Sequence, residues 1–329
     1  MLRRVSLLVA AVALAAAAPA RADVFGPPSG KVLTGVSGSE STSQFASQVG
    51  KHPAVFGFFT YWYSGNQYAF DAARAAHSRL MLHISTNHGY GEPERITPRG
   101  IAQGVGDSYL LGLNRKIAAF GEPVYIRLMA EMNQTNNAYC AFNRDGSPRN
   151  AAHSTRQFKA AWRRATLILR GGPVAQIDAG LAALHLPPVR GRDGGDELAE
   201  PQVSMLWVPQ TEGSPPIPRN SARAYWPGSK YVDWVGTDFY SRFPAFSKLE
   251  TFYKEFRKPF VFGEWALWGA DDPGFVHKLF DFVNSHTRVK MLVYNQGNLT
   301  GGPFRLTRYP NSTAALRAEL TKKRFLGLP

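Results

Sequence analysis

The sequence has little of what several common protein classes require. It holds one cysteine, Cys140, among 329 residues, which excludes an intrachain disulfide framework and leaves stability to a hydrophobic core. No G-x-G-x-x-G turn or P-loop follows the first strand-like run, so a nucleotide-binding sheet is not indicated. There is no G-x-S-x-G turn of a serine hydrolase. Histidine and cysteine pairs with zinc-like spacing are also missing, so we expect neither a catalytic metal nor a cofactor.

Acidic residues are under-represented relative to basic ones. Lys and Arg together number 38 against 24 Asp and Glu, a formal net charge of +14. A basic balance favours acidic partners. However, the basic residues form no block and no recognition motif, so we do not predict a nucleic-acid partner. An anionic cell-wall or capsular glycan stays open as an alternative substrate.

Only the N-terminus carries a long apolar run. The run spans Val5 to Ala18, follows two arginines and precedes the small-x-small triplet at 20–22. This pattern predicts a secretory signal peptide over residues 1–22, and the run is too short for a membrane anchor. We therefore expect a secreted bacterial protein, extracellular or associated with the cell wall, with no membrane span after signal removal. The mature chain, 23–329, is expected to form one domain and to be monomeric.

The mature chain alternates strand-like apolar runs with helical stretches. Eight such units predict a parallel sheet and favour a single (β/α)8 TIM barrel, with a doubly wound open sheet as the alternative. The Gly- and Pro-rich segment 171–201 is interpreted as an insertion between a helix and a strand. The predicted strands are 31–37, 54–62, 79–86, 123–130, 202–209, 231–240, 259–265 and 288–296, and the main helices are 43–49, 68–77, 107–120, 154–169, 248–257, 273–285 and 312–322.

Two of the predicted strands each end on a glutamate. PVYIRLMAEMN (123–133) delivers Glu131, and KPFVFGEW (258–265) delivers Glu264. By strand count these residues end the fourth and seventh strands, which face each other across a barrel mouth, and catalytic groups of such barrels lie at the C-terminal strand ends. Glycosidic hydrolysis needs two carboxyl groups, about 5–5.5 Å apart for retention and about 6.5–9.5 Å for inversion. The pair therefore predicts a glycosidase.

Other strand ends carry aromatic rings, amides and carboxylates. Sugars offer apolar C–H faces to rings and hydroxyls to paired donors and acceptors, so this combination is typical of a carbohydrate site. The residues at these ends include Trp62, Tyr63, Asn87, His88, Asn133, Trp207, Gln210, Asp238, Tyr240, Trp265, Trp268, Tyr294, Asn295 and Gln296.

Three motifs resemble glycoside hydrolase family 26, the β-mannanase-like family of retaining clan A barrels. PVYIRLMAEMN is similar to the family's strand ending in Arg-Pro-x-His-Glu-Met-Asn. YWPGSKYVDWVGTDFYS (225–241) is similar to Tyr-Pro-Gly-x-x-Tyr-Val-Asp-Trp-Val-Gly-x-Asp-x-Tyr, and KPFVFGEWA (258–266) to Lys-Pro-x-x-x-x-Glu. SMLWVPQ (204–210) also resembles the family's Val-Trp-x-Pro strand. Order and spacing agree over roughly residues 54–300.

The resemblance implies roles for individual residues. Glu131 would be the acid/base and Glu264 the nucleophile, with Tyr240 beside the nucleophile and Arg127 as a charged support. Members act on β-mannans, and some on β-1,3/1,4-glucans or xylans, without a cofactor. We accordingly expect a polysaccharide or oligosaccharide partner. The predicted substrate-binding residues, from the resemblance and from strand-end positions, are Arg127, Asn133, Trp207, Asp238, Tyr240, Trp265, Trp62 and His88.

The sequence departs from the family pattern beside the acid/base. Ala130 stands where the family usually has histidine, and 134–139 replaces an aromatic-rich stretch. Alanine cannot hydrogen-bond a sugar hydroxyl, so the neighbouring subsite must differ. Two alternatives stay open beside a retaining endo-β-glycosidase of mannanase type. One is a non-hydrolytic carbohydrate-binding barrel; the other is a hydrolase of a different β-glucan, a xylan or an anionic cell-surface glycan.

Overall fold

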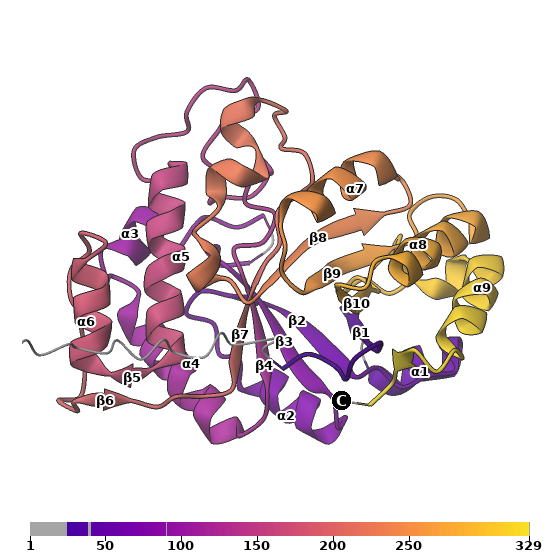
Figure 1. Ribbon diagram of the computed structural model, residues 1–329, viewed down its shortest axis with the longest axis horizontal. Helices are drawn as coiled ribbons and strands as arrows, with labels where there is room; N and C mark the ends of the chain where they lie inside the picture. Colours follow the sequence, from indigo (N-terminus) through magenta and orange to yellow (C-terminus); the bar gives the residue numbers. More distant parts are fainter. Residues whose placement is uncertain (1–24, 39–40, 90, 329) are drawn as a thin grey trace, which may run out of the picture.

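The computed structural model describes residues 25–38, 41–89 and 91–328, and within them eight parallel strands close into a barrel (Figure 1). β1 pairs with both β2 and β10, which closes the sheet. The predicted (β/α)8 barrel is confirmed, and the open-sheet alternative is wrong. The barrel strands are β1 (Val32–Ser37), β2 (Val55–Tyr61), β3 (Arg79–Ser85), β4 (Val124–Leu128), β7 (Val203–Trp207), β8 (Trp234–Tyr240), β9 (Phe260–Ala266) and β10 (Val289–Asn295).

Helices cover the outside of the barrel, with α4 and α5 on one side and α8 and α9 on another (Figure 1). Several begin at residues that accept a hydrogen bond from a free backbone N–H, as Ser154 does for α5 and Asp272 for α8. The helices are α1 (Thr42–Val49), α2 (Gln67–Ala75), α3 (Pro98–Ala102), α4 (Asp107–Phe120), α5 (Thr155–Arg170), α6 (Val174–Ala182), α7 (Phe246–Glu255), α8 (Pro273–Ser285) and α9 (Pro310–Leu320).

The insertion at 171–201 has structure of its own. It contains α6 and a two-stranded antiparallel pair, β5 (Gly172–Pro173) with β6 (Glu197–Leu198). The sequence did not predict these elements, nor α3, nor the short strand β11 (Phe325–Leu326) that pairs with the start of β1.

Alternation along each strand divides the apolar residues into two layers. One layer fills the barrel and includes Tyr125, Leu206, Trp234, Val261 and Met291. The other lies between the strands and the helices. Since successive side chains point to opposite faces, positions two residues apart share a layer, and the inward series continues to the C-terminal strand ends where the candidate site lies.

β9 carries one extra residue at its centre. β8 pairs Thr237 with Phe262 and then Asp238 with Glu264, so Gly263 has no partner in the register. A Cβ at this glycine would lie 2.8 Å from Arg127 Nε and 3.1 Å from Asp238 Oδ1. This β-bulge therefore needs glycine, and it turns Glu264 toward the barrel interior.

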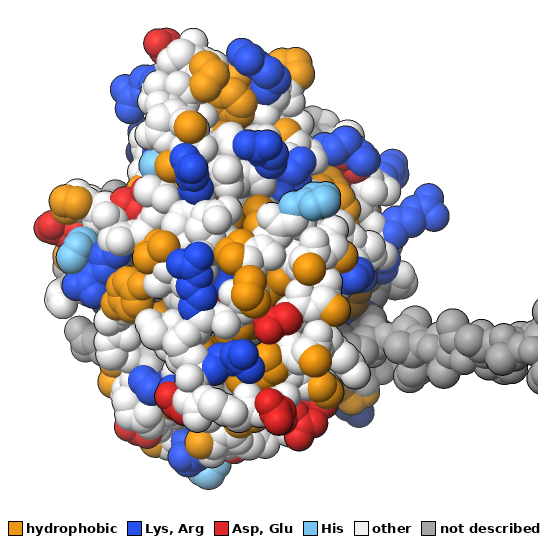
Figure 2. All heavy atoms as spheres, turned by 90° about the vertical axis from the view of Figure 1, so that its left-hand side faces the viewer, with side chains coloured by type: hydrophobic (Ala, Val, Ile, Leu, Met, Phe, Trp, Pro, Cys, Tyr) orange, Lys and Arg blue, Asp and Glu red, His pale blue; other side chains and the backbone are white. Residues whose placement is uncertain are grey.

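No helix in the described part of the chain is long and apolar enough to cross a membrane. The predicted signal peptide, 1–22, lies outside the described residues. On the face that carries α5 and α6, basic side chains are dispersed among neutral and apolar ones and form no single band (Figure 2).

We expect the contact between α4 and α5 to depend on one buried ion pair. Arg164 Nε donates to Asp107 Oδ1 at 2.7 Å, and both side chains are buried. Replacing Arg164 with Met leaves a buried carboxylate without its cation and should lower the free energy of unfolding by about 3–5 kcal/mol. Urea denaturation followed by circular dichroism measures this loss.

The matched control is Arg115→Met. Arg115 pairs with Asp193 on the surface, where the side chains are 62% and 86% exposed. Its loss should cost less than about 1 kcal/mol. Equal losses for the two variants would contradict the assignment.

Candidate active site

Arg127 lies at the centre of the site, inside the barrel. It follows Tyr125 by two residues on β4 and is fully buried. Its Nη1 donates to Glu264 Oε1 at 2.5 Å, and its Nη2 donates to Asp238 Oδ2. In register on β3, His83 contacts the same Nη1 through Nδ1 at 2.8 Å. Burial, and then the charge of Arg127, hold the pKa of His83 well below its usual value, so a neutral ring accepts this hydrogen bond.

Glu264 is surrounded by hydrogen-bond donors. Besides Arg127, the Tyr240 hydroxyl donates to Oε2, and Asn295 Nδ2 donates to the same oxygen at 2.7 Å. The residue is 8% exposed. Because every one of these bonded partners is a donor, the surroundings match an ionised carboxylate.

Glu131 lies in a different environment. Burial and the negative charge of Glu264 raise its pKa, against the lowering effects of Arg127 and of hydrogen bonds from Asp238 and Gln210. Burial also raises the pKa of Asp238 well above its usual value, again opposed by Arg127. Three carboxyl groups thus share one guanidinium, so the cluster retains protons that isolated carboxyls would lose. Glu131 is the partly exposed member.

The backbone around Glu131 is held in an unusual conformation. Met129 and Glu131 have φ angles of 45° and 52°, in the left-handed region that non-glycine residues rarely adopt. The Tyr139 hydroxyl donates to the Ala130 carbonyl at 2.6 Å, and Asn137 Nδ2 donates to the Glu131 carbonyl at 2.9 Å. The loop after β4 therefore fixes the strained turn that presents the carboxyl group.

Asn133 and Gln210 connect the loops after β4 and β7. Asn133 Nδ2 donates to the backbone carbonyl of Gln210, and the backbone N–H of Gln210 donates to Asn133 Oδ1, both at 2.9 Å. The Gln210 side chain then donates from Nε2 to Glu131 Oε1. Asn133, predicted to bind substrate, is fully buried and instead positions Gln210.

The structure gathers only part of the predicted site. It brings Glu131, Glu264, Arg127, Asp238 and Tyr240 together at the C-terminal ends of β4, β8 and β9. Three tryptophans that we predicted to bind substrate do not reach the carboxylates. The alternation of side chains along the strands turns them toward the helices, and in β9 the bulge shifts that alternation by one residue. Their rings are 0–2% exposed and pack on other aromatics, Trp62 on Tyr109, Trp207 on Phe256 and Trp265 on Tyr294.

His88 lies on the exposed loop after β3, where its Nδ1 accepts a hydrogen bond from Arg95 Nε at 2.7 Å. None of the hydrogen bonds found among the described residues joins it to the carboxyl cluster. Its predicted contact with substrate stays a prediction.

Sequence reasoning gave no role to an aromatic cluster beside Glu264. Trp268 meets the Tyr240 ring edge-on with centroids 5.8 Å apart, and Phe304 lies 5.2 Å from Tyr240. Phe243, 63% exposed, contacts Trp268 in turn. Trp268 stood in the strand-end set; Phe243 and Phe304 lie in loops that give no periodic signal. Among positioning residues, Tyr139 and Asn137 were missed for the same reason.

Comparison with known proteins supports the fold. No family model and no curated protein sequence matches the chain. Solved structures of glycoside hydrolase family 26 do match. A family 26 enzyme from Muricauda sp. MAR_2010_75 is 15% identical, with 90% of this chain and 91% of that chain covered and a TM-score of 0.55. A family 26 β-mannanase from Bacteroides ovatus is 16% identical, with 90% of each chain covered and a TM-score of 0.57.

An endo-β-1,4-mannanase double mutant from Cellulomonas fimi is 14% identical, with 90% of this chain and 72% of that chain covered and a TM-score of 0.58. At these identities the similarity establishes a shared fold, that of the family 26 mannanases. It agrees with the family indicated by the sequence motifs.

Removing the central guanidinium should destabilise the protein in a pH-dependent way. In Arg127→Met the buried carboxyls lose their cation, so the pKa values of Glu131 and Asp238, which are already raised in the folded state, rise further. Groups with raised folded pKa values contribute stability at low pH and lose it as pH rises. We expect a deficit of about 3–5 kcal/mol at pH 7 that shrinks at pH 4. Urea denaturation at both pH values measures it.

Arg74→Met is the control, because Arg74 stacks on Phe120 and donates to a backbone carbonyl instead of a carboxylate. Its deficit should not change with pH. A pH-independent deficit in Arg127→Met would show that the guanidinium does not neutralise the cluster.

Proposed function

We propose that this protein is a retaining glycoside hydrolase that cleaves a β-linked polysaccharide of mannan type, with Glu264 as nucleophile and Glu131 as acid/base. The observation that carries the proposal is the contrast between the two glutamates. Glu264 accepts from Arg127, Tyr240 and Asn295. Glu131 has a raised pKa and partial exposure. Two carboxyls whose environments separate their protonation states are the signature of an acid/base and nucleophile pair.

The reaction runs in two steps. In the first, a carboxylate oxygen of Glu264 forms a bond to the anomeric carbon as the glycosidic C–O bond breaks, and Glu131 gives its proton to the leaving oxygen. In the second, Glu131, now a carboxylate, takes a proton from water. The water oxygen attacks the anomeric carbon and the ester to Glu264 breaks, with net retention.

The neighbours of both glutamates support this division of labour. Tyr240 and Asn295 hold one oxygen of Glu264 while Arg127 holds the other, which fixes the carboxylate plane. Gln210 and the strained turn at Glu131 fix the acid. The aromatic cluster around Trp268 and Phe243 offers rings to the C–H faces of a sugar.

Mannan is proposed as the substrate from the family motifs and from the relatives' fold. We further propose that the enzyme is secreted and acts as a monomer without a cofactor, since a polymeric substrate is met outside the cell. Secretion, the monomeric state and the absence of a cofactor are all proposed from the sequence.

The test is reducing-sugar release from a panel of neutral and acidic polysaccharides. Wild type should cleave one glycan class, and Glu131→Gln should lose about 10²–10⁴-fold in kcat because the leaving oxygen is no longer protonated. Glu264→Ala should abolish turnover. On an aryl glycoside with a good leaving group, Glu131→Gln should lose much less in the first step, whereas Glu264→Ala should stay inactive.

Glu122→Gln is the matched control, since Glu122 is exposed just before β4, at the opposite end of the barrel. It should retain wild-type activity. If the panel is bound but not cleaved, and Glu264→Ala binds as wild type does, the protein is a non-hydrolytic carbohydrate-binding barrel. The absence of a donor at the fully buried Ala130 is the observation that favours this second candidate.

Gln210 should set the alkaline limit of activity. Its hydrogen bond lowers the pKa of Glu131, so Gln210→Leu raises that pKa. Glu131 must be protonated in the first step, and activity falls as pH rises through its pKa. The alkaline limb of kcat/KM should therefore move to higher pH, by about one pH unit for the loss of one hydrogen bond to a charged group. A pH–rate profile measures the shift.

The same substitution at Gln67, which bonds Asp71 on the outer helix α2, should leave the limb in place. A downward shift in Gln210→Leu, or none, would refute the role of Gln210.

A further inference from the structure

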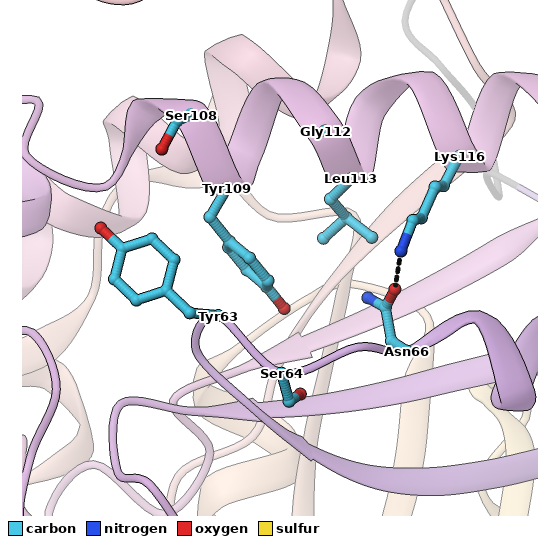
Figure 3. Close-up of a pocket in the computed structure, with 8 residues that line it drawn as sticks. All are labelled: Tyr63, Ser64, Asn66, Ser108, Tyr109, Gly112, Leu113 and Lys116. Atoms are coloured by element: carbon cyan, nitrogen blue, oxygen red, sulfur yellow. Dashed lines mark hydrogen bonds between the residues drawn. The ribbon is translucent and has the colours of Figure 1, made fainter.

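A cavity of about 270 Å³ lies outside the barrel, between the loop after β2 and the helix α4 (Figure 3). β2 leaves the barrel at the same end as the strands that carry the catalytic glutamates. At roughly 30 Å³ per water molecule the cavity holds the volume of about nine waters, which is room for one sugar ring. We call this cavity the β2–α4 pocket; the residues that carry the argument are Tyr63, Asn66, Tyr109, Gly112 and Lys116.

Two tyrosine rings form one end of the β2–α4 pocket. Tyr63 and Tyr109 lie 5.9 Å apart at 78°, and Tyr63 is 41% exposed. The Tyr63 hydroxyl donates to the Val105 carbonyl at 3.1 Å, which fixes the ring. Tyr63 has a φ of 62°, a costly conformation for a bulky side chain. An open ring held at this cost is a suitable wall for the apolar face of a sugar.

The polar lining of the pocket includes two donors, the Lys116 ammonium and the Tyr109 hydroxyl, and no carboxylate. Lys116 Nζ donates to Asn66 Oδ1 at 2.8 Å, and among the described residues it forms no ion pair. The Tyr109 hydroxyl is buried, and in the described part of the chain no group hydrogen-bonds to it. Burial raises the pKa of Tyr109, and the Asn66 amide opposes that shift, but as a donor the amide cannot accept the phenol proton. No Asp or Glu lines the cavity.

Such a lining suits a ligand that brings acceptors and negative charge. Figure 3 shows Lys116 and Tyr109 descending from α4 toward the loop residue Asn66, with Tyr63 beyond Tyr109. A buried donor without an acceptor is unfavourable until a ligand supplies one. The formal net charge of +14 adds a long-range attraction for anions.

We propose that the β2–α4 pocket binds one acidic sugar unit, a hexuronate, of a polysaccharide chain. The ring lies against Tyr63, and the carboxylate receives hydrogen bonds from Lys116 and the Tyr109 hydroxyl. This second site is separate from the carboxyl cluster. That its ligand belongs to a glycan chain rests on the proposed function. It makes the preferred polymer one that carries uronate residues.

The test compares two trisaccharides that differ in charge. Isothermal titration calorimetry measures binding of a β-1,4-linked mannuronate trimer and of neutral mannotriose. Gly112 offers an inert point of blockage, because a Cβ built there meets nothing within 4 Å. Gly112→Phe should fill the pocket and lower the affinity for the mannuronate trimer at least tenfold. Gly112→Ala, which favours the helix, should stay within twofold of wild type.

Two further variants address charge and folding. Lys116→Met should weaken binding of the mannuronate trimer about tenfold and reduce the salt dependence of that binding, while mannotriose binding stays unchanged. Tyr63→Gly removes the ring and relieves the left-handed backbone, so it should fold at least as stably as wild type and still lose the trimer.

The outcomes separate the two proposals. Glu264→Gln should lose hydrolysis and keep trimer binding at the β2–α4 pocket. If wild type cleaves no glycan but Gly112→Phe loses the trimer, the hydrolase proposal fails and the pocket stands. If Gly112→Phe and Tyr63→Gly bind the trimer with unchanged affinity, the proposal that the β2–α4 pocket binds it is overturned. Displacement of the trimer by an equal concentration of inorganic phosphate overturns its assignment to a sugar.

Discussion

A single buried guanidinium, that of Arg127, permits the rest of the site to exist. Three carboxyl groups converge inside a barrel where an unpaired charge is unfavourable by several kcal/mol. Arginine suits this position because its planar fork donates to two carboxylates at once and stays charged. Here it joins Glu264 on β9 to Asp238 on β8, while neutral His83 supports it from β3. Inward side chains of four strands, two on each side of β7, are thereby organised around one cation.

That arrangement divides protons unequally between two chemically identical side chains. Glu264 meets only donors, whereas Glu131 is raised in pKa by burial and by the charge of Glu264. Asp238, ion-paired with Arg127, interacts electrostatically with both glutamates, and burial together with their charges raises its pKa. The proton count belongs to the cluster as a whole. The proposed acid and nucleophile roles follow from these surroundings, because the sequence alone distinguishes the two glutamates only by resemblance to a family.

The barrel was predictable because its strands are short apolar runs at regular intervals, and each predicted strand lies within three residues of its observed limits. Alternation would also have removed Trp207 from the site, since Leu206 and Val208 face inward beside it. The same rule fails on β9. Counting from the inward Val261 would place Trp265 inside and Glu264 outside; the bulge at Gly263 reverses both. At the bulge Gly263 packs so closely on Arg127 that a Cβ would lie 2.8 Å from Nε, a long-range contact that no local pattern contains.

The turn at Glu131 shows how this chain functions as a scaffold without the histidine that the family usually places at Ala130. The carbonyl groups of Ala130 and Glu131 are held by Tyr139 and Asn137, both from the loop that differs from the family pattern. Gln210 holds the carboxyl group itself. The geometry of the proposed acid is thus maintained by backbone and amide hydrogen bonds. An alanine at this position offers no hydrogen bond to a sugar. We therefore infer that the chain differs from the family in substrate recognition, which the loops determine, and that the proposed catalytic groups are still supplied by the strands.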